Sequence, residues 1–190
     1  MNQELNQEKQ VNEFSFNEQS SLLKFTNGLE RYTVAFNNIL HKVSSAFLML
    51  LMFLTTADVL GRYFFNTPIT GTYELTGLIL ALMVFYSLGS AQLKGDHIEI
   101  DFFTKKMSIK NQAILRSVSS FLLFILLSLT SWQLFEYTQR MWFGGVTSGD
   151  LGLPLYIFSG LTIIGAIAFA LTLLLDSLKS LLKVVNQNES

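Results

Sequence analysis

The feature that most constrains the fold is an uncharged stretch of 19 residues between Glu74 and Lys94. A helix rises about 1.5 Å per residue, so a helix of this length spans roughly 28 Å, close to the hydrocarbon thickness of a bilayer. The polar residues within it are scattered hydroxyl and amide side chains, which can bond within the helix or to a neighbouring helix. The stretch therefore predicts a membrane-spanning helix.

Three further segments have the same character, and together they predict an all-α, polytopic membrane protein with four transmembrane helices. The chain of 190 residues is 50% hydrophobic and only 14% charged, whereas about a quarter of the residues in a soluble domain are charged. Pro154 suits the first turn of the fourth helix, where its missing N–H costs no hydrogen bond. Inside a membrane domain of residues 42–183, the expected spans are about 43–61, 74–93, 115–136 and 152–175.

The segments before and after the membrane domain differ in character. Residues 1–20 are rich in Gln, Asn and Glu, so we expect a disordered polar tail there, and residues 184–190 form a second short tail. Residues 21–41 repeat apolar side chains every three or four positions, which predicts an amphipathic helix at the membrane interface. A solvated helix packed on other protein is the alternative. The apolar positions of this helix are Leu22, Phe25, Leu29, Tyr32, Phe36 and Ile39.

The connection of residues 94–114, between the second and third spans, belongs to the most charged part of the chain. Polar and apolar residues alternate from His97 to Phe102, which predicts an extended start. Asp101 is suited to cap a short helical turn that places the following aromatic residues in the headgroup layer. We therefore expect an interfacial loop that His97 and Asp101 help to order.

Lysine and arginine are distributed unevenly along the chain. Eleven of the 13 lie before the first span, between Lys94 and Arg116, or after the fourth span. Only Arg62 and Arg140 lie in the other two connections. By the positive-inside rule, both termini and the middle loop face the cytoplasm. The first 38 residues contain no apolar run typical of a signal peptide, so we expect the spans themselves to direct the chain to the membrane.

The composition excludes several function classes. The net charge of −1 argues against a nucleic-acid partner, and the absence of cysteine excludes disulfides, thiolate metal sites and a cysteine nucleophile. The sequence contains no phosphate-binding glycine loop, no His-Glu-x-x-His and no serine nucleophile elbow. We therefore expect no catalytic residues, no metal site and no cofactor. His41 and His97 are the only histidines, and a haem held by both is an alternative.

Charged residues lie at the ends of the predicted spans, where they cost less than at mid-membrane. Asp58 and Arg62 are four residues apart, as are Glu136 and Arg140, so each pair shares a helix face and is expected to pair. Because the spans lack an evident translocation site, we expect the chain to work by contact with another membrane protein. Two faces of small residues favour close helix contact, one with Gly77 and Ala81 and one with Thr162, Ala166 and Ala170.

Four segments of the chain together resemble the small membrane subunit of tripartite ATP-independent periplasmic (TRAP) transporters. The family pattern is Arg-Tyr-x-Phe, Pro-Ile, a glutamate at the start of helix two, His-Ile-x-(Val/Ile)-Asp after that helix, and a Pro-aromatic start to helix four. The resemblance covers about residues 40–180 and does not include the extension before Leu22. The matching segments are Gly61-Arg62-Tyr63-Phe64-Phe65-Asn66-Thr67-Pro68-Ile69, Glu74-Leu75, Ser90-Ala91-Gln92-Leu93-Lys94-Gly95-Asp96-His97-Ile98-Glu99-Ile100-Asp101 and Gly152-Leu153-Pro154-Leu155-Tyr156.

The resemblance implies a three-part secondary transporter in the bacterial inner membrane. A soluble periplasmic binding protein captures an organic acid, such as a C4-dicarboxylate or sialic acid. A large membrane subunit holds the sodium and substrate sites, so sodium coupling is expected there and not in this chain. The small subunit is implied to be a scaffold whose partners are the large subunit, the binding protein and membrane lipids.

The resemblance also suggests roles for the first hairpin. Arg62 and Glu74 bracket the hairpin and are expected to pair with each other, which would fix its geometry, or to meet the binding protein. Tyr63 and Pro68, between them, are further interaction candidates. Two other functions stay open at this point. One is a membrane anchor subunit of a haem or quinone redox enzyme, and the other is a small stand-alone exporter.

Overall fold

The computed structural model describes residues 2–94 and 109–186, with side chains described for 26–94, 111–112 and 114–182. Its elements are the helices α1 (Asn2–Phe65), α2 (Thr72–Lys94), α4 (Ile109–Gly144) and α5 (Leu155–Asn186). Each contains a segment long and apolar enough to cross a membrane. The predicted all-α protein with four spans is therefore confirmed over the described residues.

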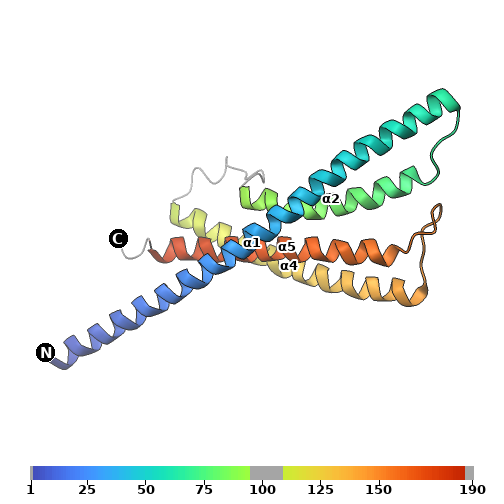
Figure 1. Ribbon diagram of the computed structural model, residues 1–190. Coiled ribbons are helices and arrows are strands. Elements are labelled where there is room, and N and C mark those ends of the chain that lie inside the picture. Colours follow the sequence, from blue (N-terminus) through green and yellow to red (C-terminus); the bar gives the residue numbers. More distant parts are fainter. Residues whose placement is uncertain (1, 95–108, 187–190) are drawn as a thin grey trace.

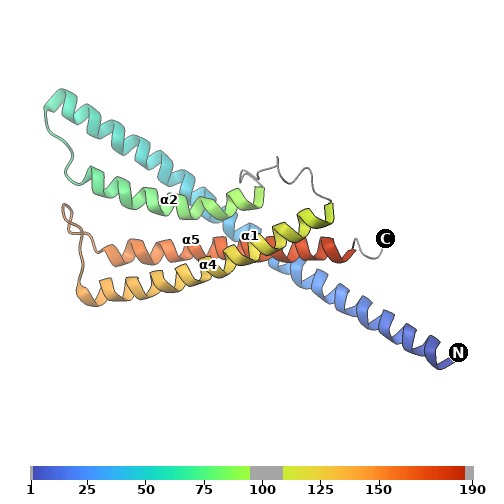
Figure 2. The same ribbon diagram turned by 180° about the vertical axis from the view of Figure 1, so that it is seen from behind.

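Helices α2, α4 and α5 run side by side, and α1 crosses them obliquely (Figure 1). The α1–α2 and α4–α5 connections lie together at one end of the bundle, and the start of α1 and the end of α5 lie at the other; the view from behind shows the same arrangement (Figure 2). The start of α1 and the end of α5 thus lie on the same side of the bundle. That this side faces the cytoplasm stays a prediction from the lysine and arginine distribution.

Helix α1 is continuous, although the sequence predicts a disordered tail, an interfacial helix and a span as three pieces. The structure has a single helix from Asn2 to Phe65, with no break near residues 20 or 42. Between Asn2 and Leu60 the sequence has no proline and only one glycine, Gly28, so nothing in it interrupts the helical hydrogen bonds.

The other helices extend beyond the predicted spans, because charged and polar residues at a span end can continue a helix into the aqueous layer. α4 begins before residue 115 and ends after 136, and α5 continues to Asn186. The fourth helix begins at Leu155, three residues after its predicted start at about 152. An isolated bridge pairs Thr147 with Pro154, and Gly152 has a positive φ of 64°, so the chain turns back before Leu155 begins the helix.

The described core lies where α5 packs between α2 and α4. Small residues on α5 allow this close approach, since a Cβ at Gly165 would meet the backbone of Phe85 on α2. Leu82 and Tyr86 of α2 pack with Leu40 of α1, and the Tyr86 ring stacks on Phe47 at a centroid distance of 6.3 Å. The remaining buried hydrophobic residues of α5 are Ala166, Ala168, Ala170, Leu173 and Leu175.

Candidate functional site

Polar contacts gather at the two ends of the bundle, and the described residues contain no group of three His, Asp or Glu side chains that could hold a metal ion. The surfaces available to a partner are the two bundle ends and the outward faces of the helices. His97 and Asp101, which the sequence places in the interfacial loop, lie outside the described residues.

Asp58 fixes the connection between α1 and α2. Its Oδ1 accepts a hydrogen bond from the Ile69 N–H at 2.9 Å and lies 3.3 Å from the Thr72 hydroxyl, while Oδ2 lies 2.6 Å from Nη2 of Arg62. The carboxylate is buried, with 6% of the residue exposed. The ion pair predicted from the four-residue spacing is present, and it also holds the loop that follows α1.

Arg62 extends the polar contacts of Asp58 towards the surface of the protein. Its guanidinium carbon lies 5.3 Å from the centre of the Tyr73 ring, a cation–π geometry. A cavity of about 250 Å³ opens here between α1 and α2. Thr76 contributes a buried hydroxyl for which the described residues provide no partner. The cavity is lined by Thr55, Asp58, Val59, Arg62, Thr72, Tyr73 and Thr76.

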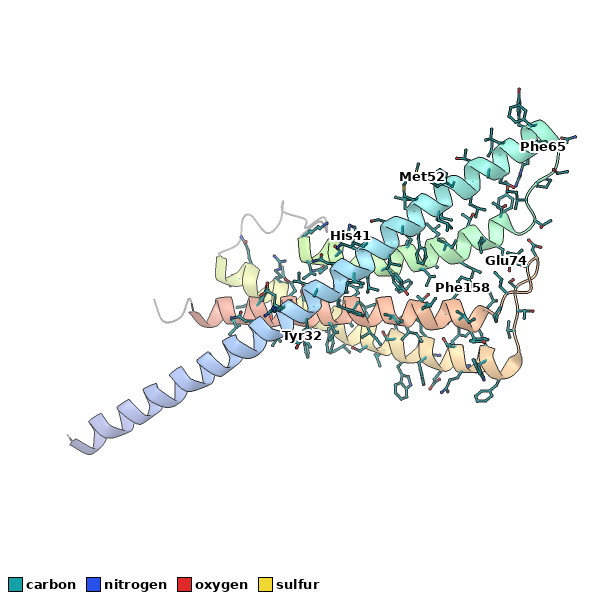
Figure 3. All side chains as sticks on the ribbon, in the orientation of Figure 1. Tyr32, His41, Met52, Phe65, Glu74 and Phe158 are labelled. Carbon is teal, nitrogen blue, oxygen red and sulfur yellow. The ribbon has the colours of Figure 1, made fainter. Side chains whose placement is uncertain are left out.

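Glu74 joins the two connections to each other. Its Oε2 accepts hydrogen bonds from the backbone N–H groups of Asp150 and Leu151, both at 3.1 Å. The expected pairing of Glu74 with Arg62 is therefore wrong, because Asp58 holds Arg62 from one turn away on the same helix while Glu74 points to the α4–α5 loop (Figure 3).

We name the joined connections the tip: residues 62–74 and 142–154. Aromatic side chains on the tip are widely exposed, as is typical of residues at the headgroup level of a membrane. Pro68 is also exposed, between them in the first loop. The exposed aromatic residues of the tip are Tyr63, Phe64, Phe65, Tyr73, Trp142 and Phe143.

The second predicted ion pair lies on the outside of α4. Nη2 of Arg140 is 3.6 Å from Oε2 of Glu136, and the Trp132 indole N–H donates to the same carboxylate at 3.2 Å. The side chains of Arg140 and Glu136 are 66% and 47% exposed. This pair therefore joins no two helices.

At the opposite end of the bundle, Asp176 joins three helices. Its carboxylate lies 3.1 Å from Nη2 of Arg116 and accepts hydrogen bonds from the Ser120 hydroxyl at 2.8 Å and the Gln92 amide at 3.4 Å. Sequence reasoning treated Asp176 and Arg116 only as charges at span ends. Their positions, just after the fourth span and just before the third, were a usable signal, since neighbouring antiparallel spans place such residues at one depth.

A polar contact between α1, α2 and α5 was also missed. Asn37 is 1% exposed, and its Nδ2 donates to the Thr33 carbonyl and to the Thr172 hydroxyl, both at 2.9 Å. Its Oδ1 lies in the space that a Cβ at Gly89 would occupy. One heptad before Asn37, Glu30 pairs with Lys179 at 2.6 Å. In the sequence, Asn37 lies on the polar face of the predicted amphipathic helix, and nothing in that pattern indicates that the polar face packs against the other helices.

The two faces of small residues have different surroundings. Thr162, Ala166 and Ala170 on α5 are buried in the bundle. Gly77 and Ala81 on α2 are exposed, and a Cβ built on Gly77 meets no atom within 4 Å. The α2 face is thus open to contact from outside the chain.

Comparison with known proteins gives one family. Residues 51–183 match the family model described as tripartite ATP-independent periplasmic transporters, DctQ component. No curated protein and no solved structure matches the chain. The match covers well over half of the 190 residues and includes all of α2 and α4 and most of α5. The chain therefore belongs to the DctQ family, the small membrane component of TRAP transporters.

Proposed function

We propose that this chain is the non-catalytic scaffold of a TRAP transporter. It holds the large, sodium-coupled subunit in the inner membrane and helps to receive the periplasmic binding protein during uptake of an organic acid. The transported solute is a carboxylate of the C4-dicarboxylate or sialic acid type. Family membership supports the transporter role. The observation that carries the scaffold role is that the polar contacts of the described residues bind helices and loops of this chain to one another.

The face of α2 with Gly77 and Ala81 is the proposed contact for the large subunit. Lipid gives helices little hydrophobic reason to associate, so small residues that let two backbones approach closely are a main source of affinity in a membrane. Leu80 and Val84 border this face and are about half exposed, which supplies side chains that can interlock with a neighbouring helix.

The tip is the proposed contact for the binding protein. If the bundle end with the chain termini faces the cytoplasm, as the positive-inside rule predicts, the tip faces the periplasm. Asp58 and Glu74 hold both loops of the tip in place, so a partner would meet a preorganised surface and lose little conformational entropy on binding. The four candidate spans support a multi-pass protein of the inner membrane, and the distribution of lysine and arginine supports cytoplasmic termini.

Reconstitution tests the scaffold role. The chain would be placed in liposomes alone, with its large subunit, and with the large subunit plus the binding protein, and uptake of a radiolabelled organic acid would be followed under a sodium gradient. We expect uptake only with all three parts and none with the chain alone. Solute accumulation by the chain alone would overturn the proposal in favour of a stand-alone transporter.

The same liposome system tests whether the large subunit needs this chain for transport. A large subunit that transports at full rate without this chain would also overturn the proposal.

An absorbance scan of the purified chain adds a separate check, because a Soret band would indicate the alternative haem anchor.

A further inference from the structure

Where α1 crosses the bundle, it buries several polar residues and exposes several apolar ones. Thr33 and Asn37 face inward and are 2% and 1% exposed, whereas Tyr32 and Ile39 face outward and are 80% and 60% exposed. A helix packed at a water surface has the opposite arrangement, with its apolar side against the protein. An apolar environment would therefore stabilise the exposed apolar side chains of α1 between Tyr32 and Val43.

Charged contacts fix the depth of this part of α1. Glu30 pairs with Lys179 of α5, and Asp176, one turn back along α5, pairs with Arg116. Charged groups are costly in hydrocarbon, so this layer lies near the headgroups. Asn37, two turns along α1 from Glu30, meets Thr172 slightly deeper in the bundle. The outward apolar side thus spans the boundary between acyl chains and headgroups.

Two basic residues flank the apolar side. Arg31 and Lys42 are 11 residues, or about three helical turns, apart, so they lie on the same side of α1 with roughly 16 Å between them along the axis. Both are exposed, and neither forms an ion pair with a described residue. Their long aliphatic stems let both charges reach the headgroup layer from different depths.

We propose that this basic-aromatic face (Arg31, Tyr32, Phe36, Ile39 and Lys42) binds anionic phospholipid. Charge complementarity selects this occupant. Another protein helix could cover the apolar side chains, but two exposed cations, which have no ion-pair partner among the described residues and whose long stems can reach the headgroup layer, match the phosphates of anionic lipid. The inference needs only that the chain lies in a membrane, and it holds or fails independently of the proposed scaffold role.

The first experiment measures lipid affinity directly. The purified full-length chain would be titrated in mild detergent with phosphatidylglycerol or with zwitterionic phosphatidylcholine, and bound lipid would be counted by native mass spectrometry. The variants are Arg31→Gln, Lys42→Gln and the double variant. Lys94→Gln is the matched control, because Lys94 is an exposed cation at the same end of the bundle but on α2.

The expected loss of phosphatidylglycerol affinity is about fivefold for Arg31→Gln and for Lys42→Gln, the usual effect of one basic residue at a charged membrane surface. The double variant loses more, and Lys94→Gln changes the affinity less than twofold. Equal binding of the two lipids by the unmodified chain would overturn the proposal. So would an equal loss in the Lys94→Gln control.

The second experiment identifies what covers the face in the assembled complex. The chain has no cysteine, so Tyr32→Cys provides a single attachment point for a short photoreactive group. Illumination in native membranes is expected to give an adduct with phospholipid. An adduct with a polypeptide as the main product, whether the large subunit or a second copy of this chain, would overturn the proposal.

Discussion

Two faces of small residues with the same spacing occupy opposite environments in this protein. On α5, Ala166 is fully buried and Gly165 lies against the backbone of Phe85. On α2, Gly77 and Ala81 are open to the outside of the chain. The pattern alone predicts close helix contact but does not say with which helix. The α5 face is buried in the fold of this chain, and the α2 face is exposed.

The two ion pairs at four-residue spacing show the same contrast. Asp58 pairs with Arg62 and also holds the loop at Ile69, so the pair is part of the connection between two helices. Glu136 and Arg140 are exposed on one side of α4. A contact that joins separate elements constrains the fold, whereas a contact within one exposed helix face adds little.

The largest expected effect is from Gly165→Leu on α5. The new side chain would have to enter the space held by the Phe85 backbone, which cannot move away as a flexible side chain could. We expect α2 and α5 to separate and the folded yield to collapse. Size-exclusion profiles and circular dichroism in detergent check this, and a folded, monodisperse variant would show that this contact is not central to the bundle.

The second-largest effect is expected on assembly with the large subunit and not on the folding of this chain. Gly77→Leu together with Ala81→Leu fills the open face of α2 without meeting atoms of this chain at Gly77. We expect an unchanged Tm for the isolated chain but at least a tenfold loss of the large subunit in co-purification, about the effect of 1.4 kcal/mol. Ser128→Leu, at an exposed position on α4, is the matched control and should leave co-purification unchanged.

A smaller effect is expected for Asp58→Ala. The substitution removes the acceptor for the Ile69 N–H and the partner of Arg62, so the tip should loosen while the bundle stays folded. Hydrogen–deuterium exchange is expected to speed up at Ile69 and Thr72. Asp58→Asn keeps one oxygen acceptor, so its exchange rates should lie between those of Asp58→Ala and those of the unmodified chain. Unchanged exchange in both variants would contradict the role of Asp58 in anchoring the loop.

Glu136→Gln should have the smallest effect. The carboxylate and its partner Arg140 are both largely exposed, and such pairs contribute little because water and salt screen them. We expect a Tm within experimental error of the unmodified chain. A clear fall in the Tm would contradict this and show that the pair stabilises the folded chain.

The sequence was sufficient for the parts of the fold that depend on length and polarity. Long apolar stretches with few or no charges predicted all four spans, and the four-residue spacing predicted both ion pairs. It could not predict the start of α5, because the bridge from Thr147 to Pro154 depends on contacts across a loop. It also missed the inward position of Asn37, since hydrophobic periodicity does not tell whether the apolar side of a helix faces protein or lipid.

The carboxylate of Glu74 has a mechanical consequence for the tip. By holding the amides of Asp150 and Leu151, it links the α1–α2 hairpin to the α4–α5 hairpin, next to the place where the Leu151 side chain lies against Gly71 of the first loop. A force on either loop is therefore transmitted to the ends of all four helices. An insertion in one loop would strain the other, so the lengths of the two loops are coupled even though 76 residues separate Glu74 from Asp150.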